Sequence, residues 1–468
     1  MFFRSFFDEN LAHMSYLVGC QRTGEAIVID PARNVEPYLR TAKKEGLTIT
    51  AATETHIHAD FVSGARQLAK ECGAVLYLSD EGDENWKYLY LNDVQHVLVK
   101  DGSTFKIGNV EFQVIHTPGH TPESISFLLT DLGGGSVEPM GIFSGDFVFV
   151  GDIGRPDLLE KAAGIVGTSD IGARQMFRSL KKFKALPDFL QVWPAHGAGS
   201  ACGKALGAVP ASTVGYEKRN NWALQIEDEE QFVKTLLTGQ PEPPKYFAMM
   251  KHLNKVGPAY AASERIPVIA GADQLKELPA DTVLIDTRPS ADYAKAHFSG
   301  SINIPFNKSF TNWAGWLVKY DQDIVLIAQG EQLDDIRKAL ASIGLDRVVG
   351  LIEPSTALAT PQSVEKYEEI DVHQLQQLLG DESYYLVDVR NQAEWDEGRI
   401  QGANHFMLGT LPDRMQQLPQ GMTYVMQCRS GARSAIAASL LQAGGFKNVL
   451  NVKGGYLEWT RAGLPVVK

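Results

Sequence analysis

Short apolar runs alternate with polar turns throughout the N-terminal half of the chain. Runs rich in β-branched and aromatic residues and bounded by turn residues are typical of β-strands. The pattern predicts strands at residues 14–18, 26–30, 47–52, 74–78, 94–99, 110–115, 124–129 and 141–144. Residues 35–45 and 62–72 instead space their apolar positions three and four apart, which predicts helices. We therefore expect two sheets covered by helices.

The C-terminal half repeats one pattern at a constant offset. Residues 284–293 align with residues 386–395, and Gly300 aligns with Gly402. This indicates a duplicated unit of about a hundred residues. Each copy reads as a strand, an Asp-x-Arg motif, a helix, a second strand and a second helix, which is typical of a parallel α/β sheet.

A proline-rich stretch at 239–244 suggests where the first domain ends. We predict a first domain over residues 1–245, a linker over 246–265, one α/β domain over 266–355 and another over 356–468.

Composition narrows the class of protein. The chain has 468 residues, of which 44% are hydrophobic, and a net charge of -12. The acidic balance argues against a nucleic-acid surface. No apolar run reaches the roughly 18 residues that a membrane span needs, and the start of the chain turns acidic too soon for a signal peptide. We expect a cytoplasmic protein that binds neither nucleic acid nor membrane.

The cysteines do not form a paired pattern. Cys20, Cys72, Cys202 and Cys428 are spread singly along the chain. Neither a disulfide framework nor a thiolate zinc site is indicated. A cysteine with a chemical role would act alone.

Candidate metal ligands follow several predicted strands. They are His56, His58, Asp60, His120, Asp146 and His196. If the strand before His56 continued, its period of two would point His56, His58 and Asp60 to one side. Imidazole and carboxylate suit zinc or ferrous iron better than calcium or magnesium. Taken singly, such residues are also common as polar side chains at a loop mouth.

The motifs T-H-x-H-x-D, T-P-G-H-T, S-G-D and P-A-H occur in this order. Together they resemble the metallo-β-lactamase superfamily over about residues 1–245. The resemblance implies an α/β fold, an αββα sandwich with its metal site at one edge of the sheets. The resemblance implies a first metal held by His56, His58, His120 and Asp146. It implies a second metal held by Asp60, the residue after it, His196 and Asp146.

One position departs from that pattern. Hydrolases of the superfamily usually have a histidine after the aspartate, where this chain has Phe61. His56, His120 and Asp146 then form a 2-His-1-carboxylate triad, whose open positions suit a substrate anion and O2 on ferrous iron. This is similar to the persulfide dioxygenases, which oxidise a thiol-bound sulfane sulfur to sulfite.

That resemblance implies one Fe(II) per chain. His58, Asp60 and His196 would orient the ligands through hydrogen bonds. The alternative is a dinuclear zinc thioester hydrolase similar to glyoxalase II.

Two further residues are candidates for substrate binding. Arg155 is similar in placement to the arginine that holds the substrate's anionic group in those dioxygenases, although an isolated arginine is more often part of a surface ion pair. Cys202 follows His196 closely enough to meet a persulfide, although a buried spectator thiol is the usual alternative.

The second C-terminal copy carries a candidate nucleophile. Cys428 follows the predicted strand 423–427 and opens the sequence C-R-S-G-A-R-S before a helix. Backbone N–H groups, the positive end of the helix, Arg429 and Arg433 would stabilise a thiolate and the outer sulfur of a persulfide. A phosphatase loop would have one more residue before its arginine.

This loop resembles that of a rhodanese, a sulfurtransferase, over about residues 368–468. The first copy, about residues 266–353, resembles a rhodanese that has lost its cysteine, because residues 328–331 read A-Q-G-E. We expect that copy to be structural. Asp388 and Arg390 could be catalytic, but a buried pair joining strand to helix is the commoner arrangement.

Together the resemblances imply a coupled enzyme. The iron domain would make sulfite from O2 and a low-molecular-weight thiol persulfide, and Cys428 would pass sulfane sulfur to sulfite, giving thiosulfate, or use thiosulfate in reverse. A sulfide sensor would need a DNA-binding element, and no basic recognition helix occurs in the sequence. We expect a homo-oligomer.

Overall fold

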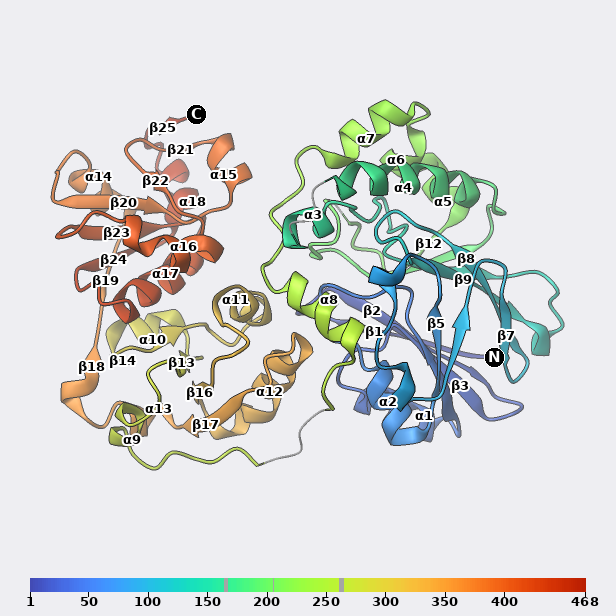
Figure 1. Ribbon diagram of the computed structural model, residues 1–468. Coiled ribbons are helices and arrows are strands. Elements are labelled where there is room, and N and C mark those ends of the chain that lie inside the picture. The colour runs from blue at the N-terminus through green and yellow to red at the C-terminus, as the bar shows by residue number, and fades with distance from the viewer. Residues whose placement is uncertain (164–166, 205, 261–264) are drawn as a thin grey trace. The chain divides into compact units, whose positions relative to one another are not determined.

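The computed structural model describes residues 1–163, 167–204, 206–260 and 265–468 (Figure 1). Of these, the residues within Met1–Ala262 and Ala341–Gly344 form one compact unit, and those within Ser263–Leu340 and Leu345–Lys468 form a second. No helix in the described parts of the chain is long and apolar enough to span a membrane.

The first unit contains two six-stranded sheets. The first has the order β1 (Phe2–Asp8), β2 (His13–Cys20), β3 (Glu25–Ile29), β4 (Thr48–Thr53), β5 (Val75–Ser79) and β6 (His96–Val99). The second has the order β12 (Ser212–Thr213), β11 (Gln191–Pro194), β10 (Gly141–Gly145), β9 (Ile125–Asp131), β8 (Val110–His116) and β7 (Thr104–Ile107). The eight strands predicted from the apolar runs are all present, within a residue or two at their ends.

One apolar core lies between the sheets and two lie outside them. Inward-facing residues of both sheets, among them Ile27, Phe112, Phe127 and Phe143, share the middle core. Helices α1 (Glu36–Lys44) and α2 (Ala65–Cys72) bury an apolar face on the first sheet, as their spacing predicted. Helices α4 (Thr168–Lys184), α5 (Val214–Asn220), α6 (Trp222–Gln225) and α7 (Glu229–Leu237) do so on the second. The expected helix–sheet–sheet–helix layering is confirmed.

Two more helices belong to this unit. They are α3 (Leu158–Ala163) and α8 (Phe247–Val256). Helix α8 forms within the segment that we predicted to be a linker, and it is part of the first unit. The boundaries of the predicted domains stay predictions.

The second unit contains the two copies of the repeat. One sheet has the order β15 (Ile302–Asn303), β13 (Val283–Asp286), β16 (Ile324–Ile327) and β17 (Val348–Ile352), and the other has β19 (Glu368–Ile370), β24 (Val449–Val452), β23 (Thr423–Gln427), β20 (Tyr384–Asp388) and β22 (Asn404–His405). All neighbouring strands in both sheets run parallel, as predicted.

The helices and small sheets of this unit complete the two copies. The helices are α9 (Asp273–Lys276), α10 (Ser290–Lys295), α11 (Phe310–Leu317), α12 (Leu333–Ser342), α13 (Pro354–Ala357), α14 (Val372–Leu378), α15 (Gln392–Glu397), α16 (Leu411–Arg414), α17 (Ala432–Ala443) and α18 (Gly455–Arg461). Two-stranded sheets pair β14 (His297–Phe298) with β18 (Val364–Glu365), and β21 (Arg399–Ile400) with β25 (Val466–Val467).

The Asp-x-Arg motif has the same structure in both copies. Arg288 Nη2 lies 2.6 Å from Asp286 Oδ2, and Arg390 Nη2 lies 2.7 Å from Asp388 Oδ2. Arg288 also donates to the carbonyl of Ala296 just past helix α10. The copy without a cysteine therefore keeps the pair, which supports the structural reading of the motif.

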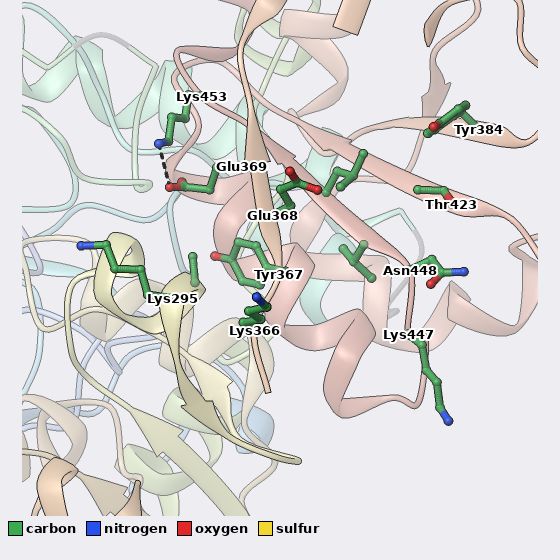
Figure 2. Close-up of a pocket in the computed structure, with 13 residues that line it drawn as sticks. Lys295, Lys366, Tyr367, Glu368, Glu369, Tyr384, Thr423, Lys447, Asn448 and Lys453 are labelled. Atoms are coloured by element: carbon green, nitrogen blue, oxygen red, sulfur yellow. Dashed lines mark ion pairs between the residues drawn. The ribbon is translucent and has the colours of Figure 1, made fainter. Parts of the chain in front are cut away.

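A basic cleft of about 780 Å³ lies beside the five-stranded sheet of the second unit (Figure 2). Its lining includes Lys295, Lys366, Lys447 and Lys453, and Lys453 pairs with Glu369 at 3.1 Å. The cleft reaches the first residues of strands β20, β23 and β24, whereas Cys428 follows the last residue of β23. It is therefore not the mouth of the Cys428 loop.

Candidate metal centre and sulfur-transfer loop

The loop that follows β4 carries the first candidate ligands. Because β4 ends at Thr53, His56, His58 and Asp60 lie in a loop and not on a strand. The strand does not continue through His56, so the alternation that would have pointed all three to one side does not apply. Each side chain instead meets a different set of partners.

His56 meets His120 and Asp146. Oδ2 of Asp146 lies 3.5 Å from Nε2 of His120 and 3.9 Å from Nε2 of His56. One ligand atom from each of the three lies within 4.8 Å of the others, and all three residues are buried. The structure thus brings together two imidazoles and one carboxylate from three separate strand ends.

The two imidazoles are held in the form that a metal needs. His120 Nδ1 donates to the carbonyl of Arg155 at 2.9 Å. The Thr55 hydroxyl donates to Asp30, so His56 Nδ1 donates to the Thr55 oxygen at 3.0 Å. Burial lowers the pKa of both His56 and His120, which keeps the rings neutral. Each ring therefore offers its Nε2 lone pair to a metal.

Unpartnered polar atoms test whether a metal fits here. Among the described residues, His56 Nε2, His196 Nε2 and both carboxylate oxygens of Asp146 and of Asp60 are buried without a hydrogen-bond partner. Buried polar atoms are normally satisfied, because leaving one unpaired costs about 1–3 kcal/mol. A bound cation would satisfy these atoms together, so the donor set fits a divalent metal.

A second cluster adjoins the first. Asp60, His196 and Cys202 also place one ligand atom each within 4.8 Å of the others. His196 Nε2 lies 3.2 Å from Asp60 Oδ2 and 3.4 Å from Asp146 Oδ1. Burial raises the pKa of Cys202 to about 12, with the charges of Asp60 and Asp146 adding to the effect. Cys202 is therefore a protonated thiol in the absence of a metal.

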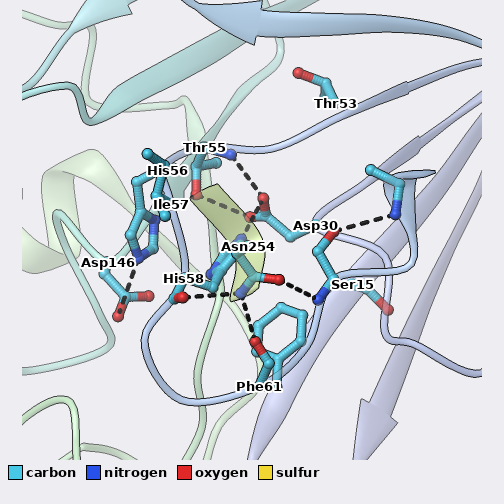
Figure 3. Close-up of polar contacts among 12 residues, drawn as sticks. Ser15, Asp30, Thr53, Thr55, His56, Ile57, His58, Phe61, Asp146 and Asn254 are labelled. Atoms are coloured by element: carbon cyan, nitrogen blue, oxygen red, sulfur yellow. Dashed lines mark hydrogen bonds and ion pairs between the residues drawn. The ribbon is translucent and has the colours of Figure 1, made fainter. Parts of the chain in front are cut away.

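His58 pairs with Asp30 and not with a member of the triad. Its Nε2 lies 3.1 Å from Asp30 Oδ1. Burial lowers the pKa of His58, but the charge of Asp30 outweighs it and the pKa rises to about 9. The same carboxylate of Asp30 accepts from the backbone N–H of Thr55 at 2.7 Å (Figure 3). His58 and Asp30 thus brace the start of the loop.

Phe61 packs beside the imidazole rings of His58 and His13. It is buried, with its ring centroid 4.4 Å from that of His58 and 3.9 Å from that of His13. A phenyl ring offers no metal ligand, so the described residues supply none at this position.

The Cys428 loop joins strand β23 to helix α17. Cys428 is buried, and its Sγ accepts from the N–H of Gly431 at 3.2 Å and from the hydroxyl of Ser434 at 3.4 Å. The loop leaves no room for a side chain at Gly455, because a Cβ there would lie 2.2 Å from the carbonyl oxygen of Cys428. The sulfur thus sits against the start of helix α17, where one N–H and one hydroxyl donate to it.

The two arginines of the loop differ. Arg433 makes a two-pronged ion pair with Glu394, with both N–O distances 2.7 Å. Arg429 is exposed.

The corresponding loop of the first copy has no cysteine. Its strand β16 is followed by Ala328 and Gln329, and Glu353 accepts a hydrogen bond from the N–H of Gly330 at 2.8 Å.

Both halves of the chain match known protein families. A model of the metallo-beta-lactamase superfamily matches residues 9–196, and a model of the rhodanese-like domain matches residues 271–353 and 371–462. The crystal structure of a metallo-beta-lactamase from Staphylococcus aureus is 45% identical, covers 76% of this chain and 99% of its own, and has a TM-score of 0.69. The chain belongs to the metallo-beta-lactamase superfamily and carries two rhodanese-like domains.

Relatives of this metallo-beta-lactamase superfamily member are chemically diverse. A sulfurtransferase of Allochromatium vinosum is 43% identical over 100 residues, 21% of this chain and 94% of that protein. The mitochondrial persulfide dioxygenase ETHE1 of Bos taurus is 26% identical over 238 residues, 50% of this chain and 79% of that protein. A hydroxyacylglutathione hydrolase of Rhodospirillum rubrum is 34% identical over 181 residues, 39% of this chain and 60% of that protein.

Coverage of some relatives is partial. The chain spans 53% of the length of a beta-lactamase hydrolase-like protein of Xylella fastidiosa, with 29% identity over 253 residues.

Arg155 of this superfamily member is fully buried. It forms an ion pair with Asp157, in which Nη2 lies 2.6 Å from Oδ2, and it donates to the carbonyls of Ala201 and Pro241. It would reach a substrate only after some of these contacts loosen. Its binding role stays a prediction.

The sequence analysis did not identify Asp30 and Glu123, whose side chains bind the backbone of the loop that carries His56 and His58. Asp30 has a positive φ of 49°, which is unusual for a residue other than glycine. Glu123 accepts from the N–H of Ile57 at 2.8 Å, and burial raises the pKa of Glu123 to about 7. The position of Asp30 directly after a buried strand was the one signal that could have revealed it.

Proposed function

We propose that this chain is a ferrous-iron persulfide dioxygenase coupled to a sulfurtransferase. The metal domain would oxidise a low-molecular-weight thiol persulfide with O2 to sulfite, and Cys428 would exchange sulfane sulfur between a persulfide and thiosulfate. The observation that carries the proposal is the buried triad of His56, His120 and Asp146, with Phe61 where hydrolases of the superfamily have a further ligand. The relative named persulfide dioxygenase supports it.

The first reaction balances as RSSH + O2 + H2O giving RSH and sulfurous acid. When bound by His56, His120 and Asp146, ferrous iron supplies open coordination positions and redox chemistry for O2. Asp60 and His196 lie beside these ligands and would orient them and the substrate. Phe61 and His13 are both buried, and their rings pack against each other beside the loop.

The second reaction occurs at Cys428. Sulfite attacks the outer sulfur of a Cys428 persulfide, an S–S bond forms in thiosulfate, and the bond from that sulfur to Sγ breaks. The leaving Cys428 thiolate is received by the N–H of Gly431 and the hydroxyl of Ser434. In reverse, Cys428 takes sulfur from thiosulfate. Arg429 is exposed and would attract the sulfur oxyanion, while Arg433 is held by Glu394.

The remaining expectations belong to the same proposal. They are one Fe(II) per chain, a cytoplasmic location, a homo-oligomer, no nucleic-acid partner and no membrane partner. Arg155 and Cys202 stay candidates for contact with the persulfide.

A zinc-dependent thioester hydrolase is the second candidate, favoured by one observation. Asp60, His196 and Cys202 form a second cluster next to the first, and Asp146 faces both. Such a pair of sites could hold two metals, as a dinuclear hydrolase requires.

Two substrates distinguish the candidates. Iron-loaded protein is given glutathione persulfide in air and under argon, and zinc-loaded protein is given a glutathione thioester. Sulfite that forms only in air supports the dioxygenase. Thioester hydrolysis that is independent of O2, without sulfite formation from the persulfide, would establish the hydrolase instead.

A further inference from the structure

One buried amide side chain binds the backbone of residues 58–63, in the loop that follows β4 and carries Asp60. Asn254, on helix α8, is buried, and its Nδ2 donates to the carbonyls of His58 at 2.9 Å and Phe61 at 2.7 Å (Figure 3). Its Oδ1 accepts from the N–H of Ser63 at 2.9 Å. All the polar atoms of this side chain are therefore used on the backbone of the loop that carries Asp60.

Helix α8 is fixed in place by contacts other than Asn254. Phe247 and Met250 share its buried face. The carbonyl of Lys255 accepts from the N–H of Leu89 at 2.8 Å, and Lys251 Nζ lies 3.4 Å from the centroid of the Trp86 ring. The helix thus presents Asn254 from a docked position, so the amide acts as a fixed template for the loop.

The pattern of donors and acceptors requires an amide. The loop offers two carbonyls and one N–H, and only a side chain with two donors and an acceptor satisfies all three. A carboxylate of the same shape would place an acceptor oxygen where the amide has its donor, next to the two carbonyl oxygens, and would repel them. An apolar side chain would leave three backbone groups buried without partners, which is costly.

We propose that Asn254 is a positioning residue for the metal centre, acting through the loop that carries His58 and Asp60. Other side chains hold the start of this loop: Asp30 binds Thr55, and Glu123 binds Ile57. Asp30 also binds the ring of His58, but of these three braces only Asn254 binds the loop on both sides of Asp60, at the carbonyls of His58 and Phe61. It lies outside residues 9–196, which the superfamily model matches, so part of the metal centre depends on a helix beyond that region.

The inference rests on the proposed metal site, and Co(II) binding tests it without any turnover. Metal-free full-length protein is titrated with Co(II), whose visible absorption reports both affinity and ligand geometry. The variants are Asn254→Asp, which keeps the shape and removes the two donors, and Asn254→Ala. His252→Ala, on the exposed side of the same helix, is the matched control.

We expect both Asn254 variants to bind Co(II) about 10- to 100-fold more weakly, the loss typical when a group that orients a ligand is removed. Their absorption bands should shift, while His252→Ala matches the wild type. Thermal unfolding of the metal-free proteins shows whether the variants are folded. If Asn254→Asp does not fold, Asn254→Ala provides the comparison.

Unchanged Co(II) affinity and spectrum in a folded Asn254 variant would overturn the inference while leaving the metal site intact. Lowered thermal stability with unchanged Co(II) binding would also overturn it, because the residue would then be structural only. A wild-type protein that binds no Co(II) would overturn the proposed function itself, and the inference with it.

Discussion

Asp146 and His196 lie 3.4 Å apart, measured from Oδ1 to Nε2, so one carboxylate joins the two ligand clusters. The other oxygen of Asp146 faces His56 and His120. Asp146 is thus the residue on which both candidate metal positions depend. Under the proposed function, the residue after Asp60 sets how many metals the domain holds.

Replacing Phe61 by histidine should add the ligand that the hydrolases of the superfamily have. We expect Phe61→His to raise bound zinc from about one to about two ions per chain, because a four-coordinate zinc site gains a donor. Metal analysis after dialysis measures this. Phe61→Leu should stay at the wild-type count. Two zinc ions in the wild type would contradict the assignment of Phe61.

Removing the shared carboxylate should release the metal. Asp146→Asn should weaken metal binding by more than the roughly 100-fold that loss of an orienting group costs, because the variant loses the charged ligand itself. Isothermal titration with Fe(II) under anaerobic conditions checks this. Asp170→Asn, at an exposed position, serves as the control. Wild-type affinity in Asp146→Asn would remove Asp146 from the ligand set.

Cys428→Ser should separate the two reactions. Without the thiol the chain cannot carry sulfane sulfur, so thiosulfate should fall to background while sulfite accumulates and O2 uptake continues. Product analysis by chromatography measures both anions. Cys72→Ser, at a half-buried position on helix α2, should behave as the wild type. Thiosulfate at the wild-type rate in Cys428→Ser would contradict the coupled scheme.

The Glu394–Arg433 pair predicts a pH dependence of stability. Burial raises the pKa of Glu394, but the hydrogen bonds and charge of Arg433 outweigh it and leave the pKa below its ordinary value. The pair therefore stabilises the fold above the ordinary glutamate pKa, and this contribution is lost as the pH falls through the lowered value. We expect a loss of about 1 kcal/mol or less, because both side chains are partly exposed.

Thermal unfolding measured from neutral to acidic pH tests the pair. Glu394→Gln should lower stability at neutral pH and should differ less from the wild type at acidic pH. A constant difference across the range would show that the ion pair is not the source of the effect.

Much of the fold could be predicted because apolar periodicity is a local signal. The strands around Ile27 and Phe112 follow from it, and the repeat revealed the parallel sheets of the second unit. The convergence of His56, His120 and Asp146 could be predicted because these residues come from motifs at strand ends. The loop geometry was not, because β4 stops at Thr53. Asn254 is about two hundred residues from the loop it binds, so no local pattern links the two.

The most direct test of the central claim is O2 consumption by anaerobically iron-loaded protein given glutathione persulfide or coenzyme A persulfide, with metal counted on the same sample. We predict rapid uptake with about one iron per chain and loss of that uptake in Asp146→Ala. No uptake by the wild type, with close to two zinc ions per chain and turnover of a thioester, would contradict it.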